Sequence, residues 1–127
     1  MSDGVIAVGT GAALGAWLRW RLGLLLNPIF PAIPLGTLCA NLFGGYVMGL
    51  TISLLAHVET LPAEVRLFAA TGFLGGLTTF STFSAEAVAL IGRQEYGWAA
   101  VMISVHVGGS LLMTALGIIS MNLLLTS

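Results

Sequence analysis

The chain has 127 residues, of which 57% are hydrophobic and only 7% are charged, and its mean hydropathy is +1.03. Ordinary soluble domains carry roughly 25% charged residues, so a lipid bilayer rather than water is the expected solvent. A net charge of −1, from four arginines, five acids and no lysine, leaves no basic patch for nucleic acid or for anionic lipid. The single cysteine, Cys39, excludes an internal disulfide and a multi-cysteine metal site.

Four stretches are apolar and long enough to cross a bilayer, which takes about 20 residues each. The first ends at Asn27-Pro28, and prolines at 31 and 34 keep the connection from continuing as helix. Residues 57–66, the most polar part of the sequence, follow the second stretch, and residues 92–95 close the third. We expect one all-α membrane domain over residues 1–127, with spans at about Val5–Leu26, Leu35–Leu55, Val65–Ile91 and Trp98–Leu125.

The arginines give only a weak signal for orientation. With four spans, one side of the membrane receives Arg66 and the other receives Arg19, Arg21 and Arg93, whereas cytoplasmic loops normally carry a clear excess of positive residues. Arg19 lies inside a helical pattern, which reduces the difference further. Such a chain could insert both ways up and pair head to tail; a fixed orientation set by few charges is the alternative.

Polar side chains recur at helical spacing in the second and fourth spans. The stripes are Thr37, Asn41 and Gly45 in the second span, and His106, Ser110 and Thr114 in the fourth. Polar groups inside a membrane are costly and face protein or water, so two aligned stripes predict a polar path. Hydrogen bonding between packed helices is the alternative reading.

Small residues spaced four apart predict close helix packing. They are Gly11 and Gly15 in the first span, and Gly36, Ala40 and Gly44 in the second. A bundle of four helices has little room for an aqueous pore at its centre. We therefore expect the path to run where protomers meet, and the protein to be an oligomer.

The third span contains a run that disfavours continuous helix, because adjacent glycines precede β-branched threonines in Gly75-Gly76-Leu77-Thr78-Thr79. We predict a break near Gly75–Thr78. A break within the membrane frees backbone carbonyls that must be buried in protein or bind something, and carbonyl oxygens suit a hard cation such as Na⁺. A glycine-kinked helix with its carbonyls capped by threonine hydroxyls is the alternative.

Aromatic and titratable residues follow this run. Phe80 and Phe83, three residues apart, point from one face; such rings ordinarily contact lipid or protein, but their positive edges can also face a small anion. Glu86 is either a proton or ion site or a carboxyl close to the membrane surface. His106 could titrate near neutral pH or be a satisfied neutral side chain.

Three runs in this order resemble the Fluc (CrcB) fluoride channels of bacteria: GAALGAWLRW at 11–20, GTLCANLFG at 36–44 and GFLGGLTTFSTFS at 72–84. The last run is highly specific, and the length and four spans also match. The resemblance implies an antiparallel, dual-topology homodimer in the bacterial cytoplasmic (inner) membrane. It further implies two separate fluoride pores, a structural Na⁺ on the two-fold axis, and passive export of fluoride that protects the cytoplasm.

The resemblance also implies roles for individual residues. The backbone carbonyls of Gly75 and Thr78 match the positions that hold the central Na⁺. A tyrosine that the family often has in the fourth span is absent from residues 101–104, so one member of the polar track beside the phenylalanines stays unassigned. The candidate fluoride pore comprises Phe80 and Phe83, the pore asparagine Asn41, Arg19 near the entrance, Ser110, Thr114 and His106 of the fourth span, and Thr37 and Glu86 of the further polar track.

Two other classes stay open. A proton-coupled efflux transporter similar to the small multidrug resistance proteins would also be a tiny four-span dimer, but those proteins rely on a glutamate in the first helix, so Glu86 would have to take that role from the third span. An accessory membrane subunit would use the polar stripes as interface contacts. We expect no enzyme, because no nucleophile is paired with a base and His57 and His106 lack a ligand cluster.

Overall fold

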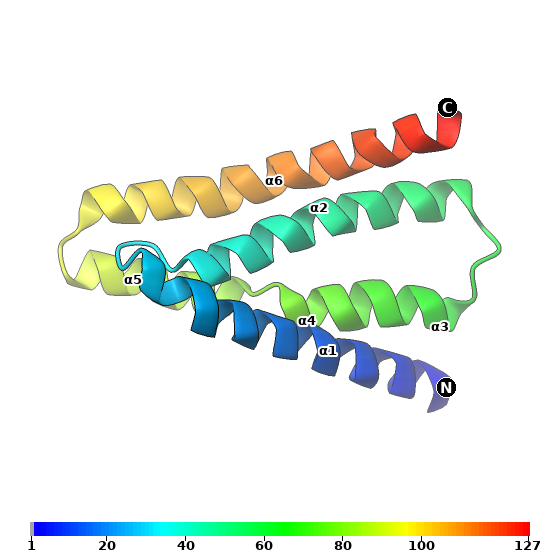
Figure 1. Ribbon diagram of the computed structural model, residues 1–127, viewed down its shortest axis with the longest axis horizontal. Helices are drawn as coiled ribbons and strands as arrows, with labels where there is room; N and C mark the ends of the chain where they lie inside the picture. The colour runs from blue at the N-terminus through cyan, green and yellow to red at the C-terminus, as the bar shows by residue number, and fades with distance from the viewer. Residues whose placement is uncertain (1) are drawn as a thin grey trace.

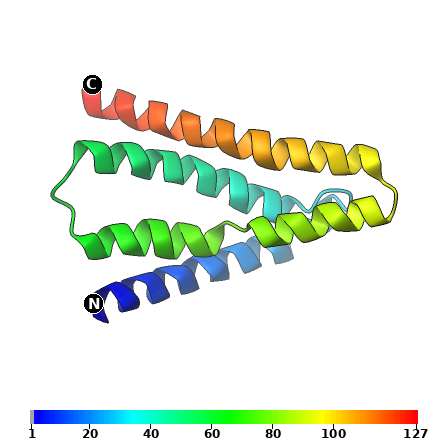
Figure 2. The same ribbon diagram turned by 180° about the vertical axis from the view of Figure 1, so that it is seen from behind.

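The computed structural model describes residues 2–127, which form an all-helical up-and-down bundle (Figure 1). Four rods alternate in direction, and the third consists of several pieces. The N-terminal end of α1, the α2–α3 connection and the C-terminus lie at one end of the bundle, and the other two connections lie at the opposite end (Figures 1 and 2). The elements are α1 (Ser2–Leu26), η1 (Asn27–Ile29), α2 (Leu35–His57), α3 (Ala63–Arg66), η2 (Leu67–Leu74), α4 (Gly75–Leu77), α5 (Phe80–Gly92) and α6 (Tyr96–Thr126).

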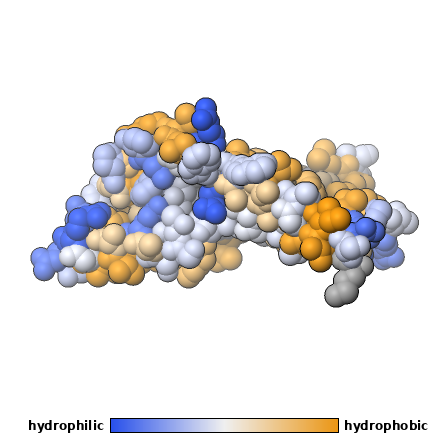
Figure 3. All heavy atoms as spheres, turned by 90° about the horizontal axis from the view of Figure 1, so that it is seen from below, coloured by the Kyte–Doolittle hydropathy of each residue, from blue (hydrophilic) through white to orange (hydrophobic). Residues whose placement is uncertain are grey.

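Three rods are long and apolar enough to cross a membrane: α2, the third rod over Ala63–Gly92, and α6. Helix α1 has 25 residues, which gives about 38 Å at 1.5 Å per residue, but it is not among these three. Apolar side chains extend along the whole face drawn in Figure 3, whereas hydrophilic ones gather toward the end that carries the α5–α6 connection. The predicted all-helical membrane class is confirmed, and the fourth crossing stays a prediction.

The rods pack as two closely associated pairs, α2 with α6 and α1 with the third rod (Figure 1). Both predicted ladders of small residues lie where helices approach closely, and all five members are buried. A Cβ on Gly15 would lie 2.1 Å from the carbonyl oxygen of Phe73, and a Cβ on Gly44 would lie 2.2 Å from Cγ2 of Thr78. Only glycine permits these approaches, so Gly15 holds α1 and Gly44 holds α2 against the third rod. Gly36 packs on α1 instead, because a Cβ there would lie 2.4 Å from the carbonyl oxygen of Leu22.

The third rod changes its helical form along its length. Residues of η2 make wide turns of the π type, in which each N–H bonds five residues back, and Gly75–Leu77 add a single α-helical turn. The backbone is extended at Thr78 (φ −85°, ψ 154°) and Thr79 (φ −151°, ψ 117°) before α5 begins. A break in the third span was predicted and is present.

The break lies at the C-terminal edge of the predicted Gly75–Thr78 range, because Gly75 and Gly76 are helical and Thr78 and Thr79 are extended. A Cβ on Gly76 would lie 2.4 Å from the carbonyl oxygen of Ala12, so this glycine serves close helix packing rather than backbone freedom. The extended conformation suits β-branched side chains. The threonines, not the glycines, therefore interrupt the helix.

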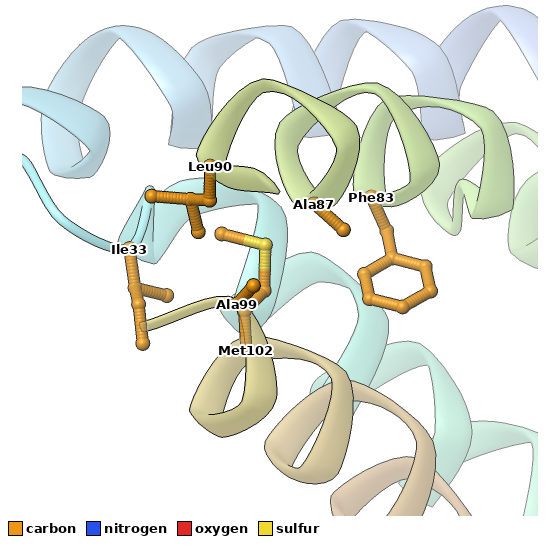
Figure 4. Close-up of a cluster of buried hydrophobic side chains, with 6 residues drawn as sticks. All are labelled: Ile33, Phe83, Ala87, Leu90, Ala99 and Met102. Atoms are coloured by element: carbon orange, nitrogen blue, oxygen red, sulfur yellow. The ribbon is translucent and has the colours of Figure 1, made fainter. Parts of the chain in front are cut away.

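Two buried clusters flank the break. One joins α5 to α6 and to the α1–α2 connection, where Leu90 and Met102 are among the most buried side chains (Figure 4). Its members are Ile33, Phe83, Ala87, Leu90, Ala99 and Met102. The other cluster is Ala40, Leu74 and Leu77, where α2 meets the end of the first half of the third rod. The extended segment is thus held between two packed regions.

The three tryptophans, which favour membrane surfaces, lie toward one end of the bundle. Trp17 and Trp20 are in the C-terminal half of α1, and Trp98 is in the first turn of α6, where its ring meets Phe30 edge-on at 5.4 Å. Tyr96, beside Trp98 in sequence, is exposed like the three tryptophans. The sequence contains three tryptophans in all, so the opposite end of the bundle has none.

Candidate functional site

A groove of about 450 Å³ lies between α2, the broken third rod and α6. Each of these three elements contributes polar atoms to it, although most of its wall is apolar. The groove brings together six of the nine predicted pore residues and both predicted Na⁺ ligands. These residues are Asn41, Phe80, Phe83, His106, Ser110, Thr114, Gly75 and Thr78.

The two predicted polar stripes face each other across the α2–α6 contact. Nδ2 of Asn41 lies 3.1 Å from Nδ1 of His106, and closer to the C-terminal ends of both helices Oγ1 of Thr114 donates to the carbonyl oxygen of Gly45 at 3.0 Å. The same side chains line the groove. The hydrogen-bonding reading of the stripes is therefore confirmed, because these residues bond the two helices together, and the polar path stays a prediction.

Asn41 reaches from α2 to the extended segment of the third rod. Its Oδ1 accepts a hydrogen bond from the N–H of Thr79 at 2.7 Å, and its Nδ2 donates to the carbonyl oxygen of Thr79 at 3.0 Å. The Thr79 hydroxyl in turn accepts from the N–H of Thr82 at 3.1 Å, which caps the N-terminus of α5. Sequence reasoning missed Thr79; a threonine just before a helical run is an N-cap signal that could have identified it.

The break leaves several carbonyl groups without their helical donors, among them those of Gly75 and Thr78. In a continuous helix the N–H groups of Thr79 and Thr82 would bond to Gly75 and Thr78, but here side chains take both N–H groups. Gly75 and Thr78 line the groove, and their freed oxygens are hard ligands of the kind that Na⁺ prefers. Within residues 2–127, no group of three or more histidine, cysteine, aspartate or glutamate side chains gathers to hold a metal ion. The carbonyls therefore fit the predicted cation.

Arg19 of α1 contacts the same break from the other side. Its Nε donates to the carbonyl oxygen of Gly76 at 3.0 Å, so this carbonyl is satisfied by a positive charge. Arg19 also borders a second, smaller cavity of about 290 Å³, which Thr37, Thr79 and Thr82 line as well. Sequence reasoning placed Arg19 near a pore entrance and did not foresee its bond to the backbone.

Thr37 and Glu86 form a pair one turn along α2 from Asn41. The Thr37 hydroxyl donates to Oε2 of Glu86 at 2.8 Å. The other carboxylate oxygen of Glu86, Oε1, is buried and has no hydrogen-bond partner among residues 2–127. Thr37 and Glu86, which were assigned to one polar track, are thus in direct contact, and Oε1 of Glu86 remains an unpaired acceptor.

Phe80 and Phe83 project from the first turn of α5 and pack edge to face, with ring centroids 5.4 Å apart. The ring of Phe83 also lies against the imidazole of His106, at a centroid distance of 4.6 Å. Phe83 is only 6% exposed, whereas Phe80 is 74% exposed at the open side of the groove. The spacing of Phe80 and Phe83 predicted that the two rings share a face of the helix, and their contact confirms it.

Comparison with known proteins identifies the family. The family described as CrcB-like protein, camphor resistance (CrcB), matches residues 6–118. A fluoride-specific ion channel FluC of Nitrosospira multiformis is 61% identical over 116 residues, 91% of each chain. Proteins of the same name from Cupriavidus taiwanensis (59% over 115 residues, 91% of each chain) and Pseudomonas paraeruginosa (57% over 125 residues, 98% of each chain) are similarly close. The chain therefore belongs to the Fluc (CrcB) family.

Proposed function

We propose that this protein is a fluoride-selective, passive ion channel that lets fluoride leave the cytoplasm, and that it is not an enzyme. The observation that carries the proposal is its 61% identity, over 91% of its length, to a protein named fluoride-specific ion channel. Passive export would confer fluoride resistance on a bacterium that carries the channel in its cytoplasmic membrane. The groove supports the same function through its chemistry.

Fluoride loses a tightly held hydration shell when it enters a protein, so a pore must replace water with hydrogen-bond donors and positive edges. The groove wall offers the Ser110 hydroxyl and the edges of the two phenylalanine rings, whereas the Thr114 hydroxyl gives its hydrogen to the carbonyl oxygen of Gly45. The Thr37–Glu86 pair continues the polar line beyond Phe83. In the proposal, fluoride moves along this wall past the rings.

We further propose that α1 is the fourth membrane crossing and that two copies pair in opposite orientations, with one pore in each copy. The groove supports the pairing of two copies because apolar side chains are exposed along it. Among them are Phe80, which is 74% exposed, Leu111, which is 68% exposed, and Val107, which is 45% exposed. A second copy would cover these surfaces. The weak arginine bias supports insertion in both orientations.

The central Na⁺ belongs to the same proposal. Gly75 and Thr78 would each contribute a carbonyl oxygen, so two protomers together supply four. When bound at such a site, the ion adds a fixed positive charge between the two pores. The freed carbonyls described above support this assignment.

The test of the function is fluoride efflux from liposomes loaded with potassium fluoride, started with valinomycin, followed with a fluoride electrode and compared with a matched chloride experiment. Liposomes that contain a selective channel lose fluoride rapidly without a proton gradient and retain chloride.

Efflux that appears only under an opposing proton gradient would instead identify a proton-coupled exporter. The unpaired Oε1 of Glu86 favours the proton-coupled exporter as the second candidate. In that case Glu86→Gln would abolish the coupling of fluoride efflux to proton movement. Absence of any flux would identify an accessory subunit.

Dual orientation predicts equal labelling of both ends of the bundle. In a Cys39→Ala background, Leu61→Cys places a thiol in the α2–α3 connection, and Glu95→Cys places one in the α5–α6 connection. A membrane-impermeant maleimide added to intact spheroplasts should label about half of either variant. A single orientation would give nearly complete labelling of one variant and almost none of the other.

Sodium binding predicts a salt-specific gain in stability. A ligand present at 100 times its Kd stabilises the folded state by about 2.7 kcal/mol. The unfolding midpoint of the purified protein should therefore be higher in sodium chloride than in potassium or choline chloride at equal ionic strength. An identical midpoint in all three salts would contradict the Na⁺ site.

A further inference from the structure

The side chain of Asn41 uses all of its hydrogen-bonding groups on the protein itself. Its Oδ1 and Nδ2 pair with the N–H and the carbonyl oxygen of Thr79, at 2.7 and 3.0 Å. This pairing fixes which end of the amide is nitrogen, because only Nδ2 can donate to a carbonyl oxygen. The second hydrogen of Nδ2 is left for the atom 3.1 Å away, Nδ1 of His106.

The contact with Asn41 defines the protonation state of His106. An amide nitrogen only donates, so Nδ1 of His106 must accept, and the ring proton must be on Nε2. A proton on Nδ1, whether in the other tautomer or in the doubly protonated ring, would face the Nδ2 hydrogens. His106 is therefore neutral with an Nε2–H group.

The Nε2–H group of His106 is a buried donor without a protein acceptor. His106 is 3% exposed, and its Nε2 has no hydrogen-bond partner among residues 2–127. A buried donor left unpaired costs free energy, which is regained when an acceptor arrives. Phe83 packs against the same ring, and both side chains line the groove. A small anion in the groove is the acceptor that this arrangement fits.

We propose that Asn41 is a positioning residue, which holds Thr79 out of the helix and keeps His106 in the tautomer whose Nε2–H is available to the transported anion. This inference rests on the proposed function. Asn41 then acts through two partners and need not contact fluoride. It links the geometry of the break, which starts α5 and so places Phe80 and Phe83, to the donor beside those rings.

The tautomer can be measured directly by ¹⁵N NMR of histidine-labelled protein in lipid at neutral pH. The chain has two histidines, so a His57→Gln background isolates the signals of His106. We expect Nδ1 to show a pyridine-type shift and Nε2 a pyrrole-type shift. A proton on Nδ1 in this background would overturn the proposal, and this measurement does not depend on how well any Asn41 variant folds.

Asn41→Asp tests the causal step. The carboxylate still accepts the Thr79 N–H but presents an acceptor to Nδ1, so the proton of His106 should move from Nε2 to Nδ1. Fluoride efflux should then fall by about tenfold to a hundredfold, as expected for loss of one hydrogen bond to a charged species. The matched control is Asn122→Asp, which alters an asparagine of the same helix as His106 that pairs with Ser53 and should leave the tautomer unchanged.

The outcomes separate this proposal from the channel function. Protein that shows the Nε2–H tautomer but carries no fluoride would refute the channel function and leave the role of Asn41 toward His106 intact. Conducting protein whose tautomer and flux both ignore Asn41→Asp would refute the positioning role and leave the channel intact.

Discussion

Phe83→Ile should reduce fluoride efflux from liposomes by at least about tenfold, and up to about a hundredfold, while the protein stays folded. Phe83 is buried against His106 and Phe80, and isoleucine is apolar enough to occupy this site but has no ring edge to offer an anion. We take the ring edge to contribute as much as one hydrogen bond to a charged group, about 1.5–3 kcal/mol. Its loss then raises the barrier by that amount, and each 1.36 kcal/mol is about tenfold in rate.

The control for this prediction is Phe30→Ile. Phe30 also takes part in an edge-on aromatic pair, with Trp98 at 5.4 Å, but it is outside the groove. The control should cost a comparable aromatic contact without changing the flux. Equal efflux by Phe83→Ile and the unmodified protein, or equal losses in both variants, would remove the pore role of Phe83.

Gly15→Ala should destabilise the folded protein by about 3 kcal/mol or more, at the upper end of what overpacking costs. The added methyl group would lie 2.1 Å from the carbonyl oxygen of Phe73 and 2.7 Å from the backbone nitrogen of Leu77. Both atoms belong to backbone, which cannot turn aside as a flexible side chain can. The helices would have to separate where α1 supports the segment that leads into the break.

Gly9→Ala, two turns earlier in the same helix, should have the opposite sign. A Cβ there meets nothing within 4 Å, and replacing glycine by alanine inside a helix gains about 0.5–1 kcal/mol. Unfolding in detergent with increasing denaturant measures both variants. Similar midpoints for the two would show that the close approach of α1 to the third rod is not what stabilises the bundle.

Periodicity predicted the parts of this structure that depend on which way a side chain points. The stripes on α2 and α6 were predicted from spacing alone, and the structure pairs them through Asn41 with His106 and through Thr114 with Gly45. The pairing follows because both helices are regular at these positions. A residue four places along a regular helix returns to the same face, whatever it contacts.

The details of the break could not be predicted in the same way. Adjacent glycines have the lowest local preference for helix apart from proline, yet Gly75 and Gly76 are helical, and Ala12 approaches Gly76 where only glycine fits. The bond from Arg19 to Gly76 likewise joins residues far apart in the chain. Local propensity contains no information about such partners.

The one-sided placement of the tryptophans has a consequence for how the protein sits in a bilayer. Indole rings settle at the depth of the lipid headgroups, so the tryptophans of a single copy anchor it in one leaflet only. No tryptophan fixes the depth of its opposite end. In the antiparallel pair that we propose, Trp17, Trp20 and Trp98 of the two copies would engage opposite leaflets. Each copy would then set the immersion depth of the other, and the pair would resist variation in bilayer thickness more strongly than either copy alone.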